Sequence, residues 1–195
     1  ALWARCWCAR GSEMTILENN PAQATLVRPS AEFRDTFLEA AGEYRAVGEE
    51  LDPAFPAYWG TPFEMYVAQL EALVKGRHLP MSMVPADTFW LVTPERRFVG
   101  MSRLRRRLTR SLRTEGGHIG YSIRPSDRRK GYGTHLCAFT IDEARKLKRY
   151  KRLLITCDTR NVASARIIEK NGGLFENHVT SPRTGRQVSR YWVTL

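Results

Sequence analysis

The sequence predicts one mixed α/β (α+β) domain whose strands and helices follow in the order β-α-α-β-β-β-α-β-α-β-β. Three observations support this prediction. The length of 195 residues suits a single domain. Hydrophobic residues make up 43% of the chain, which is enough for one core. Short apolar runs typical of strands alternate with segments of helical period, as in domains where helices pack on a sheet.

The N-terminal stretch does not fit this pattern. It places Trp3 and Trp7 among Arg5 and Arg10 without a helical or strand period, and it lacks the apolar core of a secretory signal. We therefore expect a vector-derived or upstream tail at 1–13, a polar lead-in at 14–23 and a single domain at 24–195.

The domain is expected to begin with a strand and a helix. The apolar run at 24–28 ends at Pro29, as a short strand would. Ser30 can cap the helix that follows, because its side-chain oxygen can accept from the first N–H groups. Apolar side chains then recur at helical spacing as far as Tyr44.

A loop rich in Pro and aromatic residues, at 52–62, separates this helix from the next. Thr61 is predicted to cap the second helix, with Pro62 as its first residue. The spacing predicts an apolar face formed by Phe63, Tyr66, Val67, Leu70, Leu73 and Val74.

The remaining elements follow from the same patterns. The segment 118–124 alternates apolar and polar residues, which indicates a half-buried strand. The continuous apolar run at 153–157 indicates a strand covered on both faces. We expect strands at 88–93, 98–104, 118–124, 153–157, 174–179 and 188–195, and helices at 132–148 and 161–171.

Charge and cysteine content restrict the functional class. The chain has 31 Lys and Arg against 20 Asp and Glu, so its formal net charge is +11 and an anionic partner is expected. No uncharged apolar run approaches the ~18 residues that a membrane span needs, so no membrane partner is expected. The four cysteines form no CxxC pair. They indicate reduced thiols in a cytoplasmic protein without a metal site.

One segment combines features suited to binding a phosphate. A strand ends near Ile123, a basic loop follows, and a helix begins near Tyr132. Gly131 and Gly133 allow close approach to a ligand, and the first turn of a helix offers free N–H groups. The basic residues Arg128, Arg129 and Lys130 add charge that can hold phosphate. An ordinary solvated turn is the alternative interpretation.

The motif and its surroundings resemble the GNAT superfamily of N-acetyltransferases. Residues 128–133, Arg-Arg-Lys-Gly-Tyr-Gly, match the R/Q-x-x-G-x-G/A signature of that superfamily. The segment 158–164 resembles the Asn-led helix that follows the fifth strand in these proteins, and 168–173 resembles the end of that helix. The resemblance covers about 24–195 and extends to a bacterial branch of predicted acetyltransferases.

This resemblance implies a central sheet with splayed fourth and fifth strands, between which acetyl-CoA enters. Pantetheine would run along the fourth strand, and an N–H near Ile123 would stabilise the oxyanion during direct transfer to an amine. The cofactor-binding residues implied are Tyr121, Ser122, Ile123, Arg128, Arg129, Lys130, Gly131, Tyr132, Gly133, Thr134, Asn161 and Ser164.

The catalytic groups are less well defined. Many members protonate the leaving thiolate with a Tyr where this chain has Ile168. Ser164 lies on the same helical face and could relay a proton, or it could be a small packing residue. For the general base, His118 and Glu115 are candidates, although a strand-end His is often a packing residue.

The acceptor site would come from the first two helices and the loop between them. Tyr58, Trp59 and Glu64 are the candidate acceptor-binding residues, with core packing of the aromatic rings as the alternative. The expected acceptor is a small-molecule or peptide amine, and the protein is expected to be a monomer or homodimer.

Two other functions remain open at this stage. The missing Tyr permits a catalytically silent CoA-binding sensor. The stretch from Arg103 to Arg113, with six arginines, permits a nucleic-acid-binding module. We favour a solvated hairpin for this stretch and expect no stable nucleic-acid complex, because no stacking aromatic residues accompany the arginines.

Overall fold

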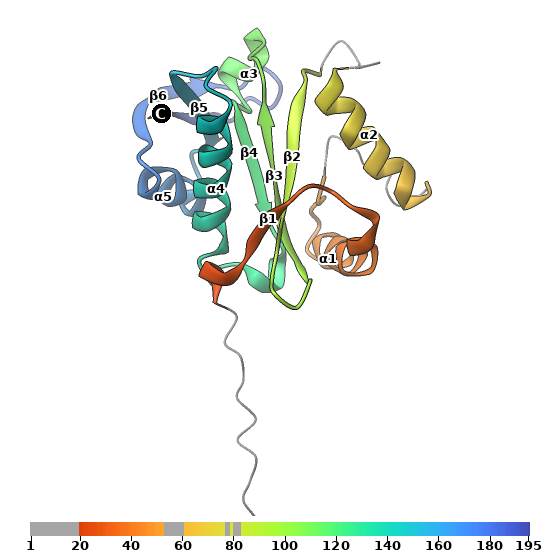
Figure 1. Cartoon of the computed structure of the whole chain (residues 1–195). Helices are drawn as coiled ribbons and strands as arrows, with labels where there is room; N and C mark the ends of the chain where they lie inside the picture. Colours follow the sequence, from red (N-terminus) through yellow and green to blue (C-terminus); the bar gives the residue numbers. More distant parts are fainter. Residues whose placement is uncertain (1–19, 53–60, 77–78, 80–82) are drawn as a thin grey trace, which may run out of the picture.

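A computed structural model describes residues 20–52, 61–76, 79 and 83–195. The tail at 1–13 lies outside the described residues, as does most of the lead-in. The rest forms one seven-stranded sheet with helices on both faces (Figure 1). In sheet order the strands are β1 (Thr25–Val27), β2 (Ala86–Val92), β3 (Phe98–Arg105), β4 (Ile119–Ile123), β5 (Arg152–Asp158), β7 (Gln187–Thr194) and β6 (Leu174–Thr180).

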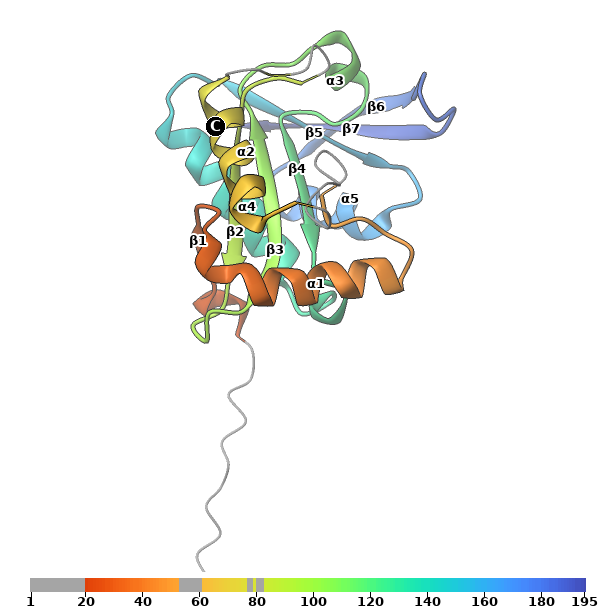
Figure 2. The same cartoon turned by 90° about the vertical axis from the view of Figure 1, so that its right-hand side faces the viewer.

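The helices divide between the two faces of the sheet. Helices α1 (Arg34–Ala46) and α2 (Phe63–Lys75) cover one face, and α4 (Tyr132–Lys146) and α5 (Val162–Lys170) cover the other (Figures 1 and 2). A short helix, α3 (Arg110–Thr114), joins β3 to β4. Apart from α3, this is the predicted element order, and the mixed α/β class is confirmed. Among the described residues, no helix has the length and apolar character needed to cross a membrane.

Each face of the sheet has its own core. On the α1–α2 face, the ring of Phe37 stacks on Trp90 at a centroid distance of 5.0 Å and meets Phe98 edge-on at 5.1 Å. On the α4–α5 face, Ile119 and Ile155 pack with Ile141 of α4. Burial of these side chains stabilises the sheet by roughly 1.5–3 kcal/mol each.

The structure corrects several predicted boundaries. Ser30 does accept from a backbone N–H, that of Glu32, but the turn it caps is a short 3-10 helix that precedes α1. Pro62, not Thr61, is the cap residue of α2, and it makes no side-chain cap hydrogen bond. Helix α4 ends at Lys146 because Lys148 adopts a left-handed conformation, with φ +50°.

Strands β4 and β5 separate from each other, as predicted. All other neighbouring strands are antiparallel, whereas these two are parallel and pair only at Ile119 and Ile155 among the described residues. Because β4 pairs with β3 through its even-numbered residues, the N–H groups of Tyr121 and Ile123 face the gap beside β5. The gap therefore leaves backbone N–H groups of β4 without a strand partner in the middle of the sheet.

The structure corrects the prediction of a solvated hairpin after β3. Arg103 is buried and forms an ion pair with Asp52, with 2.7 Å between Nη2 and Oδ2. Arg106 pairs with the buried Asp87 at 2.9 Å. Arg105 donates to backbone carbonyls instead. Half of the six arginines are therefore structural, because two pair with buried aspartates and one donates to backbone carbonyls.

Candidate functional site

A cavity of about 460 Å³ lies where β4 and β5 separate. It is lined from the sheet by Gly120, Tyr121 and Cys157, and from α5 by Ser164. Successive side chains of a strand point to opposite faces of the sheet. Tyr121 lies on the α5 face, whereas Gly120 lies on the face of α1 and α2. The cavity thus connects the two faces through the gap between the strands.

On the α5 side, Tyr121 and Ser164 form a hydrogen-bonded pair. The Tyr121 hydroxyl lies 2.8 Å from Ser164 Oγ and 3.3 Å from the Ser164 carbonyl oxygen. Asn161 caps α5, because its Oδ1 accepts from the Ser164 N–H at 2.9 Å. Burial raises the pKa of the Tyr121 phenol far above its usual range. Two adjacent hydroxyl groups therefore stay protonated in the cavity at neutral pH.

On the opposite side, the cavity is lined by charged residues. Glu115 accepts from Ser181 Oγ at 2.5 Å and from Arg183 Nη2 at 2.7 Å. Arg105 and Arg186 also line the cavity, as does Asp158. A hydrogen bond from the Arg160 side chain lowers the pKa of Asp158 to about 2. The site thus combines two carboxylates with three guanidinium groups.

The loop after β4 presents a row of free backbone donors. Gly131 adopts φ +92°, a conformation that other residues rarely adopt, and it directly precedes α4 without a side-chain cap. No described residue accepts a hydrogen bond from the N–H groups of residues 129–133. The N–H of Thr134 is turned into the helix, where it donates to the Gly131 carbonyl at 3.0 Å. The free N–H groups and the positive end of the α4 dipole together suit an anion.

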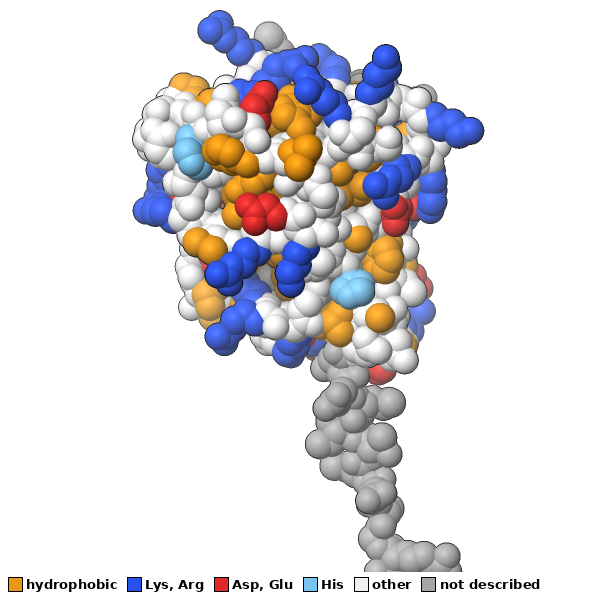
Figure 3. Space-filling view, turned by 90° about the vertical axis from the view of Figure 1, so that its left-hand side faces the viewer, with side chains coloured by type: hydrophobic (Ala, Val, Ile, Leu, Met, Phe, Trp, Pro, Cys, Tyr) orange, Lys and Arg blue, Asp and Glu red, His pale blue; other side chains and the backbone are white. Residues whose placement is uncertain are grey.

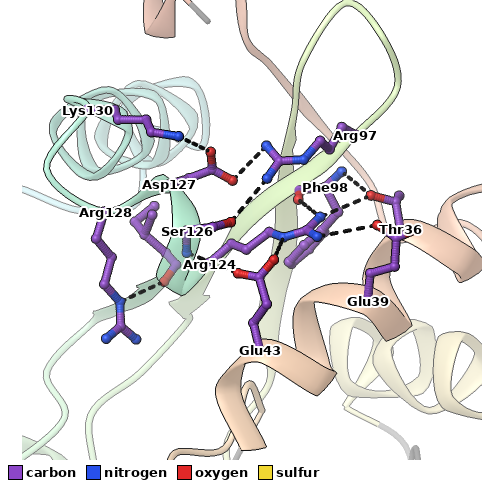
Figure 4. A network of polar contacts seen from close by, with 11 residues as sticks. Thr36, Glu39, Glu43, Arg97, Phe98, Arg124, Ser126, Asp127, Arg128 and Lys130 are labelled. Atoms are coloured by element: carbon purple, nitrogen blue, oxygen red, sulfur yellow. Dashed lines mark hydrogen bonds and ion pairs between the residues drawn. The ribbon is translucent and has the colours of Figure 1, made fainter. Parts of the chain in front are cut away.

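A network of ion pairs holds this loop in place (Figure 4). Arg124 is buried and donates from Nε to Glu43 of α1 at 2.7 Å. Glu43 also accepts from the Ser126 N–H at 3.0 Å. The buried Asp127 pairs with Arg97 at 2.7 Å and with Lys130 at 3.1 Å. These contacts fix both sides of the loop to the sheet and to α1.

Two of the three predicted phosphate-binding side chains are already engaged. Arg128 donates from its two terminal nitrogens to Glu49 at 3.0 and 2.6 Å and from Nε to the Ile123 carbonyl. Lys130 is held by Asp127. Arg129 is exposed, with φ +65°, and makes no ion pair with any described residue. The geometry therefore leaves Arg129 as the free cation of the predicted set.

His118 lies between β4 and β5 rather than in the cavity. Its ring Nδ1 accepts from the backbone N–H of the buried Leu154 at 2.8 Å. The backbone N–H of His118 donates to the Leu154 carbonyl at 2.7 Å. Burial, together with Arg113 and Arg105, lowers the pKa of His118 to about 4. The lone pair of the neutral ring is thus used to join the two strands, which favours a structural role.

Three other positions discussed from the sequence, Tyr132, Ile168 and Ser122, are clearly placed, as is the thiol of Cys157. Tyr132 is buried, 1% exposed, so its hydroxyl does not reach the site and only its N–H can contribute. Ile168 is fully buried in the core. Cys157 lines the cavity, but burial raises the pKa of its thiol, which disfavours a thiolate nucleophile. Ser122 points to the α1 side, where its Oγ donates to the Leu51 carbonyl at 3.5 Å.

The predicted acceptor-binding residues are not brought to this cavity by the described structure. Tyr58 and Trp59 lie outside the described residues. Glu64 is exposed in the first turn of α2 and does not line the cavity. Among the described residues, no group of three or more His, Cys, Asp or Glu side chains is placed to hold a metal ion.

Three arginines of the site were missed by sequence reasoning. Arg183 and Arg186 lie in the turn between β6 and β7, and Arg105 lies at the end of β3. No local motif marks them, because they meet only through the sheet order that places β7 beside β5. The Thr184-Gly185 turn between two strands was the only local signal that a hairpin would end there.

Comparison with known proteins identifies relatives of the fold. The family model described as acetyltransferase (GNAT) domain matches residues 37–173. A ribosomal-protein-S5-alanine acetyltransferase from Vibrio fischeri has a TM-score of 0.65 and 18% identity, covering 88% of this chain and 93% of its own. The microcin C7 self-immunity acetyltransferase MccE, solved with acetyl-CoA and AMP, has a TM-score of 0.65 and 15% identity. The match covers 89% of this chain and 93% of MccE.

A third similar structure is the ribosomal L7/L12 α-N-protein acetyltransferase RimL, in complex with coenzyme A joined to a cysteine by a disulfide. Its TM-score is 0.65 and its identity 14%, with 89% of this chain and 94% of that chain covered. At such identities the likeness is one of fold. No curated protein of similar sequence was found.

Proposed function

Because this chain belongs to the GNAT family of acetyltransferases, we propose that it transfers the acetyl group of acetyl-CoA directly to a primary amine. The observation that carries the proposal is the cavity at the β4–β5 gap, because β4, which lines it, leads directly into the loop of free N–H groups at 129–133. Acetyl-CoA supplies the acetyl group as an activated thioester. The protein then has to bind it, orient the carbonyl and move two protons. We expect the domain to span 24–195 and to work in the cytoplasm.

The donor would be held by the loop between β4 and α4. The free N–H groups of residues 129–133 and the α4 dipole suit a pyrophosphate, and Arg129 adds a free guanidinium. Arg128 and Lys130 contribute indirectly, because their ion pairs with Glu49 and Asp127 keep the loop in this conformation. Basic side chains are also spread over the face shown in Figure 3, which favours approach of an anionic donor.

The open edge of β4 suits the rest of the donor. The N–H groups of Tyr121 and Ile123 face the gap, so they can bind amide and thioester carbonyl oxygens. An N–H aimed at a carbonyl oxygen stabilises the negative charge that develops there, and it does so without reorganisation. We assign this role to Ile123, whose own carbonyl is fixed by Arg128.

The Tyr121–Ser164 pair can supply the proton that the departing sulfur needs. Both hydroxyl groups line the cavity, and the phenol stays protonated because burial raises its pKa. This pair fills the role that Ile168 cannot, and it favours an active enzyme over a silent CoA sensor. Asn161 positions Ser164 by capping α5.

Of the two predicted bases, Glu115 is the one that lines the cavity. We propose that its carboxylate takes the proton from the incoming ammonium. His118 holds β4 against β5 in this proposal, since its lone pair already accepts from Leu154. Replacement of Glu115 by Gln should lower the rate about 100-fold without weakening acetyl-CoA binding.

Acetyl-CoA binding and turnover test the proposal together. Isothermal calorimetry should show a 1:1 complex with acetyl-CoA, and a thiol-release assay should show CoA formation that depends on an added amine. Binding without amine-dependent release over a panel of small amines and peptides would favour the silent sensor. Failure to bind acetyl-CoA would contradict the proposal itself.

A further inference from the structure

Among the described residues, Arg105 is the cation of the cavity that forms no ion pair. Its Nη1 donates to the carbonyl oxygens of Gly116 and Gly117 at 2.9 and 3.2 Å. No described carboxylate lies within ion-pair distance of it, whereas Arg103 and Arg106 in the same stretch each pair with an aspartate. Its guanidinium is thus held in place with part of its hydrogen-bonding capacity unused.

The guanidinium lies directly against β4 at a residue without a side chain. A Cβ atom added to Gly120 would lie 3.5 Å from both Nη1 and Nη2 of Arg105. Burial lowers the pKa of Arg105 to about 10, so it remains charged at neutral pH. A partly buried charge without a counterion is costly, and an anionic group entering the cavity would relieve that cost.

Opposite charges line the cavity at this point. Gly116, whose carbonyl holds Arg105, directly follows Glu115 in the chain. A carboxylate and a guanidinium therefore line the same cavity from neighbouring positions. Such a pair matches a molecule that carries an ammonium and a carboxylate a few bonds apart.

We propose that the acceptor amine carries a carboxylate, which Arg105 binds while Glu115 faces the ammonium. This inference rests on the proposed acetyltransferase function and names the class of its acceptor. Arg183 and Arg186, in the β6–β7 turn at the same cavity, add to the attraction for an anionic acceptor. A polyamine is disfavoured, since its second ammonium would meet three guanidinium groups in the same cavity.

Matched acceptors test this inference. The rate of CoA release is measured with free amino acids against their amides, with Asp- and Glu-initiated peptides against Asn- and Gln-initiated ones, and with spermidine. We expect kcat/KM to be at least tenfold higher for the carboxylate member of a pair, the size of a charge-assisted hydrogen bond. The two series distinguish a free amino acid from an acidic peptide as the source of the carboxylate.

Two variants locate the effect. Arg105→Gln should reduce the preference for the carboxylate member to about one, whereas the control Arg107→Gln, at an exposed position two residues further on, should keep it. The two variants are first compared by thermal unfolding and by acetyl-CoA calorimetry. If Arg105→Gln does not fold, the wild-type panel still decides the question.

Three outcomes would overturn the inference. The first is an equal or better rate with amides or spermidine, and the second is a preference that survives in a folded Arg105→Gln protein. The third is a wild-type protein that binds acetyl-CoA but acetylates no carboxylate-bearing amine at millimolar concentration. Loss of acetyl-CoA binding in the wild type would instead contradict the proposed function.

Discussion

The Tyr121 hydroxyl and Ser164 Oγ lie 2.8 Å apart, so a single hydrogen bond joins β4 to α5 within the cavity. The sequence marked Tyr121 and Tyr132 only as cofactor-binding residues and gave no position for either hydroxyl group. The structure distinguishes the two, since it places the Tyr121 phenol in the cavity and buries the phenol of Tyr132.

Tyr121→Phe and Ser164→Ala should each lower kcat by about 100-fold, near the lower limit for loss of general acid catalysis. The affinity for acetyl-CoA should change little, because the backbone N–H groups remain. Single-turnover kinetics and calorimetry measure the two effects separately. Tyr132→Phe is the control, with kcat within a few-fold of wild type. A kcat in both site variants equal to wild type would exclude the pair as the proton donor.

His118 should make stability depend on pH between about 4 and 6.5. Its pKa is about 4 in the folded state and near ~6.5 when unfolded, so in this window only the unfolded state takes up the proton. Stability is therefore complete above pH 6.5 and is lost as the pH falls toward 4. The loss should be roughly 1–2 kcal/mol once partial exposure of the ring is allowed for.

His118→Asn isolates this effect, since its amide oxygen can still accept from Leu154 and does not titrate. Chemical denaturation at pH 7 and pH 4.5 should show a smaller pH dependence in the variant than in wild type. The pH–rate profile should be unchanged, because another group serves as the base. If the fall in rate at low pH disappears in the variant, the prediction is wrong and His118 is the general base.

The sequence predicted the elements well because their periods are strong. Helix α5, for instance, is marked in the sequence by Asn161 as its N-cap and by two glycines directly after its C-terminal end. The contacts that define the cavity could not be predicted, because they join residues far apart in the chain. Arg105 meets Gly116 only after α3 reverses the chain, and Glu115 meets Arg183 across 68 positions. Whether an arginine is solvated or structural is likewise decided by tertiary partners.

Gly131→Ala should weaken acetyl-CoA binding at least tenfold. The residue has φ +92°, a conformation that an L side chain rarely adopts, so relief of that strain should shift the loop and misalign its N–H groups. The control is Gly172→Ala, where φ is +81° but the Cβ would meet nothing within 4 Å. Both variants should lose about 1 kcal/mol of stability. Calorimetry should show weaker binding only for Gly131→Ala, and equal affinities would contradict the loop assignment.

Removal of Arg103 should destabilise the protein far more than removal of a neighbouring arginine. Arg103 is 9% exposed and donates two hydrogen bonds to Asp52, which is itself 2% exposed and also accepts from the Tyr66 hydroxyl. Arg103→Gln leaves a buried carboxylate without its cation, which should reduce the free energy of unfolding by about 3 kcal/mol or more. Arg107→Gln, at an exposed position, should change it by less than about 0.5 kcal/mol. Urea denaturation of both variants at neutral pH measures the difference.

Asp52→Asn in the Arg103→Gln background should recover part of the loss, because the uncompensated charge is then removed. Equal stabilities for the two single variants would show that the stretch from Arg103 to Arg113 is solvated after all.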